Sequence, residues 1–85
     1  MPITRLRRGD RNEDGEPANW SIKTMIFFAH RLKAQVTIRR IDGAVLEFDR
    51  LVTLDEFLAA MSPAKFAELG CTIEHLEDRE QGGAS

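Results

Sequence analysis

Near the carboxyl end, three residues are the only ones whose types and spacing could combine in a metal or nucleophile site: Cys71, His75 and Glu77. Side chains two positions apart share a face of an extended strand, so all three would lie together if this segment is a strand. However, a lone cysteine is usually a small buried hydrophobe, and a catalytic base needs an orienting partner that this set lacks. We therefore expect no enzyme activity, no metal site and no small-molecule cofactor.

A basic stretch without carboxylates offers a different kind of chemistry. Residues 17–41 contain five Lys or Arg and no Asp or Glu. Residues 1–42 carry a net charge of +4 and residues 43–85 a net charge of −6. This asymmetry is typical of a surface that attracts an acidic protein or the phosphates of a nucleic acid. It would also arise if the two halves simply pair within the fold or across a homodimer.

An exposed aromatic residue framed by cations is a candidate contact surface. On a helix over residues 20–33, Lys23, Phe27 and His30 line one side and Arg31 lies beside them, whereas the buried stripe would be Ile22, Met25, Ile26, Ala29 and Leu32. The same segment is rich in β-formers, so a strand is the alternative. We predict a binding surface made of Lys23, Phe27, His30, Arg31, Arg39 and Arg40.

The best-specified stretch of the chain is a β-hairpin over residues 35–49. Apolar residues alternate on both sides of Asp42-Gly43. A three-residue loop, 41–43, sets Ile38 opposite Leu46 and Val36 opposite Phe48, with Gly43 at positive φ in a G1 bulge. The outer face would then be polar, with Arg39 beside Glu47. Such a sheet is expected to be covered on one face only.

Helix signals follow the hairpin directly. Thr53 and Glu56 have the spacing of a capping box for a helix over 54–61, so capping accounts for the acidic pair at 55–56. Ser62 and Pro63 predict the start of a short helix over 63–69, which Gly70 can end in a left-handed conformation. Residues 71–77 are expected to form a third strand, with a helix over 73–81 as the alternative.

Composition indicates one small domain. The chain has 85 residues, of which 42% are hydrophobic and 31% charged. Residues 1–18 mix arginines with acids and predict a disordered arm, residues 19–77 a single α+β domain, and residues 78–85 a disordered tail. The expected architecture has two layers, with a three-stranded, mostly antiparallel sheet and helices 20–33, 54–61 and 63–69 on one face.

The expected function is non-enzymatic. These features favour a small regulatory or accessory protein that binds another protein with an acidic surface, or itself. The alternative is a nucleic-acid-binding protein that uses residues 17–41 and the Arg-rich arm. No run approaches the length of a membrane span, so no membrane partner is expected. The single cysteine fits a reducing compartment and predicts a cytoplasmic location.

Overall fold

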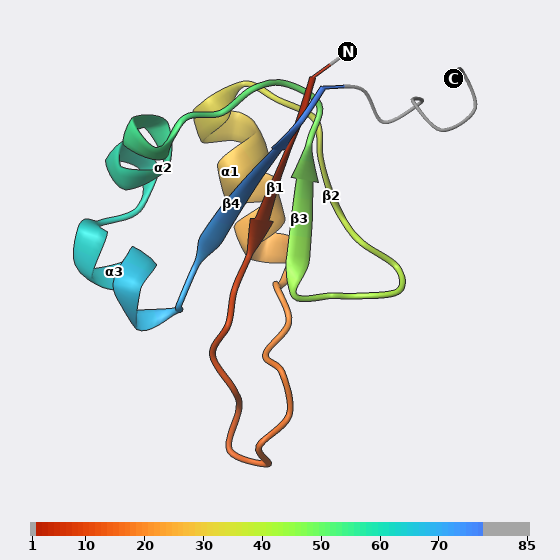
Figure 1. Ribbon diagram of the computed structural model, residues 1–85, viewed down its shortest axis with the longest axis vertical. Coiled ribbons are helices and arrows are strands. Elements are labelled where there is room, and N and C mark those ends of the chain that lie inside the picture. Colours follow the sequence, from red (N-terminus) through yellow and green to blue (C-terminus); the bar gives the residue numbers. More distant parts are fainter. Residues whose placement is uncertain (1, 78–85) are drawn as a thin grey trace.

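The computed structural model describes residues 2–77, which form an antiparallel sheet and three helices (Figure 1). In chain order the elements are β1 (Ile3–Arg7), α1 (Ile22–Leu32), β2 (Val36–Ile38), β3 (Val45–Phe48), α2 (Leu54–Ala60), α3 (Pro63–Glu68) and β4 (Thr72–Leu76). The predicted α+β class is confirmed. Within these residues the sheet has four strands in the order β2-β3-β1-β4, one more than predicted. The tail predicted for 78–85 lies outside the described residues.

The additional strand comes from the segment that was predicted to be a disordered arm. β1 lies in the interior of the sheet and pairs with β3 on one side and β4 on the other. Thr4 and Leu6 are fully buried, whereas Arg5 and Arg7 project from the opposite face. The arm prediction is therefore wrong for this segment. Its arginines belong to a strand that is stabilised by long-range pairing, which local composition does not reveal.

The rest of the predicted arm is an ordered loop that projects from the sheet (Figure 1). The side chain of Asn12 accepts hydrogen bonds from the backbone N–H groups of Asp14 and Glu16. Arg11 and Pro17 form an isolated antiparallel β-bridge across the loop. Gly15, at the tip of the loop, has a positive φ of 82°. This local network is the turn chemistry expected of an Asn-containing loop.

The connectivity interleaves two β-α-β units. β1 and β2 are joined by α1 and separated in the sheet by β3, whereas β3 and β4 are joined by the other two helices and separated by β1. This is the topology of ferredoxin-like folds. It describes the path of the chain and by itself implies no function.

The predicted hairpin register is confirmed. Val36 lies opposite Phe48 and Ile38 opposite Leu46. This register places the apolar residues of both strands on the covered face of the sheet. On the open face Arg39 lies 3.7 Å from Glu47, as expected.

The predicted turn of this hairpin is wrong. Positive φ occurs among the described glycines only at Gly15 and Gly70, so Gly43 does not form the predicted G1 bulge. Gly43 instead lies against Asn19, whose Cγ would be 2.9 Å from a Cβ atom added at this position. Its carbonyl oxygen accepts a hydrogen bond from the Trp20 N–H. A side chain at position 43 would therefore have to displace that of Asn19, in the segment that enters α1.

Residues 22–32 are a helix, so the alternative of a strand is excluded. Ser21 caps its amino end by accepting a hydrogen bond from the Thr24 N–H, and Lys33 ends it in the left-handed region with φ of 52°. The helix lies against β2 and the inner face of the sheet. Of all the helices in residues 2–77, α1 is the longest, at 11 residues, and none is long and apolar enough to cross a membrane.

The rotation of α1 about its axis differs from the prediction. Ile22 and Ile26, expected in the buried stripe, are 66% and 58% exposed, whereas Phe28 is 1% exposed. Met25, Phe28, Ala29 and Leu32 have the same helical spacing as the predicted stripe, so the pattern allowed both rotations. Packing decides between them, because Phe28 fills the centre of an aromatic cluster.

The two shorter helices begin as predicted. Thr53 and Glu56 form the capping box of α2, and Ser62 with Pro63 starts α3. Gly70 follows α3 with φ of 64°, as expected. The strand predicted for 71–77 is confirmed as β4, so the helical alternative for this segment is excluded.

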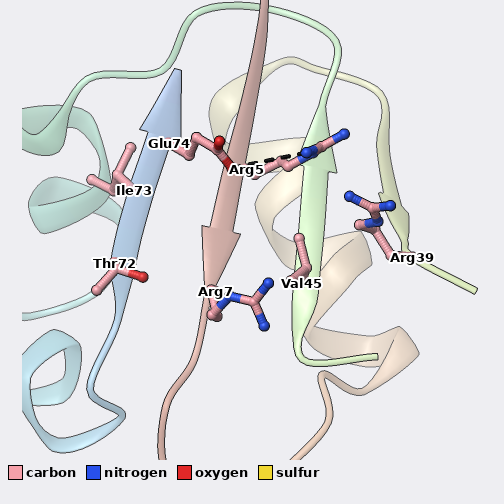
Figure 2. Close-up of a pocket in the computed structure, with 7 residues that line it drawn as sticks. All are labelled: Arg5, Arg7, Arg39, Val45, Thr72, Ile73 and Glu74. Atoms are coloured by element: carbon pink, nitrogen blue, oxygen red, sulfur yellow. Dashed lines mark ion pairs between the residues drawn. The ribbon is translucent and has the colours of Figure 1, made fainter. Parts of the chain in front are cut away.

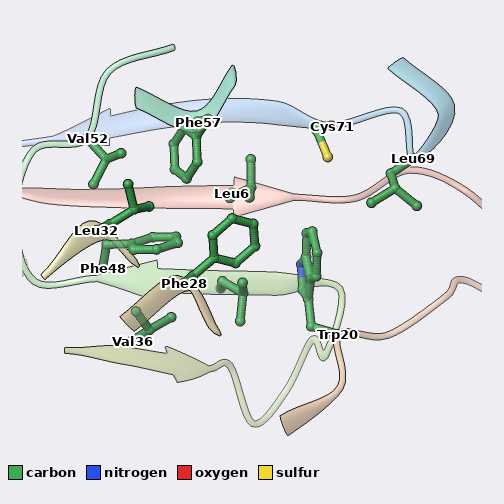
Figure 3. Packing of buried hydrophobic residues seen from close by; sticks show 11 residues of the cluster. Leu6, Trp20, Phe28, Leu32, Val36, Phe48, Val52, Phe57, Leu69 and Cys71 are labelled. Carbon is green, nitrogen blue, oxygen red and sulfur yellow. The ribbon is translucent and has the colours of Figure 1, made fainter. Parts of the chain in front are cut away.

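The core lies between the sheet and the helices (Figure 3). Phe28 of α1 meets Phe48 of β3 and Phe57 of α2 edge to face, with ring centroids 6.0 and 6.2 Å apart. Trp20 packs on Phe28 and donates its indole N–H to the carbonyl oxygen of Ala44 at 2.8 Å. Because residues of all three helices join this cluster, they cover one face of the sheet, as predicted.

Candidate functional site

The predicted surface residues of α1 all lie on its solvent side. Lys23, Phe27, His30 and Arg31 are exposed, and Phe27 is the aromatic residue among them, at 46% exposure. The Phe27 ring is held by an edge contact with Phe28, with centroids 5.6 Å apart. The helix therefore presents an apolar ring beside cations, as the sequence predicted.

A groove runs beside Phe27, between α1 and the segment that contains α3. It encloses ≈ 260 Å³ and is lined by Arg8, Trp20, Thr24, Phe27, Phe28, Met61, Lys65 and Leu69. Most of these side chains are apolar, and the two cations come from the end of β1 and from α3. An apolar side chain of a partner fits this chemistry, since ligand sites are mainly apolar with a few polar groups that orient the ligand.

Arg8 is the more constrained of the two groove cations. Its guanidinium donates two hydrogen bonds of 2.8 Å to the carboxylate of Asp10 and lies 5.0 Å from the centre of the Trp20 ring. The hydrogen bonds from Arg8 hold the pKa of Asp10 below its ordinary value, and Asp10 in turn raises the pKa of Arg8. Asp10 thus compensates the charge of Arg8, and the side chain acts as a fixed wall of the groove.

Lys65 and Lys23 are different, because neither has an ion-pair partner among residues 2–77. Lys65 lines the groove from α3, while Lys23 precedes Phe27 by one helical turn. Both ammonium groups can meet a carboxylate of a partner without first breaking an internal ion pair. The groove is consequently apolar inside, with Lys65 in its lining and Lys23 on the exposed side of α1 beside Phe27.

Arg39 and Arg40 do not belong to this surface. Arg39 lies on the open face of the sheet, the opposite side from α1, and Arg40 is exposed in the loop between β2 and β3. The predicted set of six residues is therefore divided. Four share the exposed side of α1, and the other two point elsewhere because β-strand alternation sends Arg39 away from the helical layer.

The open face of the sheet gathers three arginines around Val45 (Figure 2). Arg5 lies 2.8 Å from Glu47 and 3.8 Å from Glu74, and Arg7 lies 2.6 Å from Asp42. The depression between these side chains encloses only ≈ 80 Å³. Since carboxylates of the same face neutralise these arginines, this region is an ion-pair network that covers Val45.

The residues considered for a metal or nucleophile site do not converge. Cys71 is buried, and burial raises the pKa of its thiol to about 11. His75 lies four residues further along an extended segment, or about 13 Å away, and its Nε2 is 2.7 Å from the carbonyl oxygen of Val52. Within residues 2–77, no three His, Cys, Asp or Glu side chains are grouped as a metal would require.

Sequence reasoning missed most of the groove. Arg8 was assigned to a disordered arm, and Trp20, Met61 and Leu69 carried no signal beyond general hydrophobicity. Lys65 is the only Lys or Arg in the short helix after Ser62-Pro63, which was the one available hint. No protein-family model, curated protein or solved structure shows significant similarity to this chain.

Proposed function

We propose that this protein is a non-enzymatic accessory or regulatory protein that binds another protein through the groove between α1 and α3. The observation that supports this proposal is the position of Phe27. This half-exposed ring borders an apolar groove that Trp20 and Phe28 help to line. Aromatic residues, Phe among them, are enriched at the centres of protein interfaces, where a few well-packed residues carry most of the binding energy.

The chemistry of the partner follows from two lysines: Lys65 lines the groove, and Lys23 lies on α1 one turn before Phe27. Lys23 and Lys65 lack internal ion pairs within the described chain, so they favour carboxylates on the ligand. We propose that the ligand is an acidic segment with a large apolar side chain, which enters the groove while the acids meet the lysines. The lone buried cysteine fits a reducing compartment, so we propose that this binding takes place in the cytoplasm.

Nucleic-acid binding is the alternative function. The available cations of α1 could contact phosphates, but the open sheet face gives bases nothing to stack on. Every aromatic side chain among residues 2–77 lies in the core or in the helical layer, and none lies on the open face of the sheet. Single-stranded nucleic acids are usually held by aromatic stacking on an exposed platform. The protein-binding proposal is therefore better supported.

Trp20 provides a direct test, because it is the only tryptophan and it lines the groove. A panel of peptides, each with one Leu or Phe among glutamates, should change its fluorescence, whereas lysine-substituted peptides should not. Phe27→Ala should weaken peptide binding by about 2 kcal/mol or more. Leu54→Ala is the matched control, since Leu54 is exposed to a similar extent, 48%, on another helix.

The same assay can reveal the alternative. Single-stranded DNA or RNA should bind weakly near physiological salt. If nucleic acid binds tightly instead, its affinity should fall by about 0.9 log unit per phosphate contact for each log unit of salt, or about 0.7 for a single strand. Tight, salt-sensitive nucleic-acid binding that survives Phe27→Ala, together with no response to acidic peptides, would overturn the proposed function.

A further inference from the structure

β2 is a free edge of the sheet. Within residues 2–77 it stands at one end of the strand order and pairs only with β3. Hydrogen bonds join Gln35 to Asp49 and Arg39 to Val45, so the odd-numbered residues of this segment face β3. By the alternation of an antiparallel ladder, the N–H and C=O groups of Val36 and Ile38 point away from the sheet.

The helix beside this edge exposes two isoleucines. At about 100° per residue, Ile22 and Ile26 lie on the opposite side of α1 from Thr24 and Phe27, which line the groove. The groove side faces α3, so the isoleucine side extends towards β2, which α1 contacts. Unpaired backbone groups and exposed apolar side chains thus occur together at one border of the molecule.

We propose that this border pairs with the same border of a second copy of the chain, across a two-fold axis through Thr37. In this register Val36 of one copy lies opposite Ile38 of the other, and both pairs can exchange backbone hydrogen bonds. Thr37 meets Thr37 of the second copy, a favourable cross-strand pair. The exposed isoleucines of the two α1 helices then cover the join on the helical face.

The charged residues next to β2 permit this pairing. On the open face, Arg39 would lie opposite Gln35 of the second copy, so no like charges meet directly. Within β2 itself there is no charge, proline or bulge, the features that normally protect an edge from self-pairing.

The other edge strand provides the contrast. β4 bonds to β1 through Thr72, Glu74 and Leu76, so a pairing of its free edge in the register equivalent to that of β2, with the two-fold axis through the middle residue, would be centred on Glu74. That register would place two Glu74 carboxylates directly opposite each other, which is destabilising. In this register self-pairing is thus favoured at β2 and opposed at β4.

This inference does not depend on the proposed function, because the two surfaces lie on opposite sides of α1. A dimer formed through β2 would leave both grooves open. Its two binding sites could engage a partner with repeated acidic segments more tightly than one site alone. Once the first segment is bound, the second is held at a high effective concentration near the other groove.

Charged substitutions at Thr37 test the pairing, because its side chain is exposed and a change there leaves the core intact. Sedimentation of the wild-type chain, from micromolar to millimolar concentration, should show a species of twice the 9.6 kDa chain mass. Thr37→Lys and Thr37→Asp should each raise the dimer Kd by about tenfold or more, since like charges would meet at the axis. Mixing the two variants should restore the dimer. Thr72→Lys, on the other edge strand, is the control and should dimerise normally.

Hydrogen exchange gives a second measurement. The amides of Val36 and Ile38 should become protected as concentration rises, whereas those of β4 should not. Circular dichroism of each variant verifies that it is folded.

A chain that stays monomeric, a dimer insensitive to both Thr37 substitutions, or mixing that fails to restore the mass would each overturn the inference. Acidic-peptide binding by Thr37→Lys should be unchanged per groove, so a failure here is distinguishable from a failure of the proposed function.

Discussion

The hydroxyl group of Thr4 joins β1 to the segment that precedes α2. It accepts a hydrogen bond from the backbone N–H of Val52 at 2.8 Å and donates one to the carbonyl oxygen of Arg50 at 2.9 Å. The carbonyl oxygen of Val52 is in turn 2.7 Å from Nε2 of His75. Side chains of β1 and β4 thereby satisfy both backbone groups of a fully buried residue and fix where α2 begins.

Thr4→Val keeps the shape of this side chain but removes its hydroxyl group. The buried N–H of Val52 would lose its partner, so we expect a loss of about 1–3 kcal/mol in the free energy of unfolding. Urea denaturation measures it. Thr72→Val, at an exposed position of β4, is the control and should change stability by less than about 0.5 kcal/mol. Equal effects of the two substitutions would contradict the role assigned to Thr4.

Two adjacent phenylalanines report the rotation of α1. Phe28 is 1% exposed at the centre of the aromatic cluster, whereas Phe27 is 46% exposed. Phe28→Ala should therefore cost about 3–5 kcal/mol by opening a cavity. Phe27→Ala should cost much less, so that its effect on peptide binding can be measured in a folded protein. Thermal or urea unfolding would refute this rotation if Phe27→Ala were the more damaging change.

Glu56 should make stability depend on acidity. Hydrogen bonds from Arg50 and the Thr53 N–H lower its pKa from 4.5 to about 2. Because the folded pKa lies below the unfolded value, the stabilisation is complete above about pH 4.5 and is lost as the pH falls towards 2. Glu56→Gln retains a capping acceptor but not the charge, so it should be less stable than the wild type at neutral pH.

The difference between wild type and Glu56→Gln should shrink as the pH falls through this interval. Urea unfolding at a series of pH values measures it, and the partial exposure of Glu56 keeps the effect modest. Glu13→Gln is the control, because Glu13 is exposed at the projecting loop and has no ion pair within residues 2–77. A difference that is constant with pH would mean that the carboxylate is not selectively stabilised in the folded state.

Cys71 should be inert in the native protein. Burial raises the pKa of its thiol from 9.0 to about 11, which lowers the thiolate fraction near pH 8 by about a hundredfold. Alkylation by iodoacetamide should therefore be at least that much slower in the folded protein than in urea, and it should accelerate as the pH rises towards 11. Native labelling at the unfolded rate would show that the thiol is accessible.

Local signals in the sequence predicted those parts of the fold that local chemistry controls. The capping box of Thr53 and Glu56 depends on residues three positions apart, and the register of the hairpin depends on matching two short alternating patterns. Ser62, Pro63 and Gly70 likewise act on their own segment. In each case the interacting groups are close in the chain, so the pattern was sufficient.

The candidate site was only half predictable, because only some of its residues are close together in the chain. Helical spacing placed Lys23, Phe27, His30 and Arg31 together, because they share one helix. Helical spacing could not show that the side chain of Arg39 lies on the opposite face of the sheet. Nor could it show that Arg8 and Lys65 line the groove beside Phe27. Those residues come from segments that meet only after β1 has entered the sheet.

Thus the sequence alone determined the α+β class, the hairpin register and the starts of the two shorter helices, since each rests on contacts within a short segment. Only the tertiary structure decided that residues 3–7 are an inner strand and which side of α1 is buried. An Arg-rich segment becomes a strand when two neighbours supply its hydrogen bonds and its ion pairs. A helix with two apolar stripes turns towards the core the one that carries Phe28, because that ring fills the space between Phe48 and Phe57.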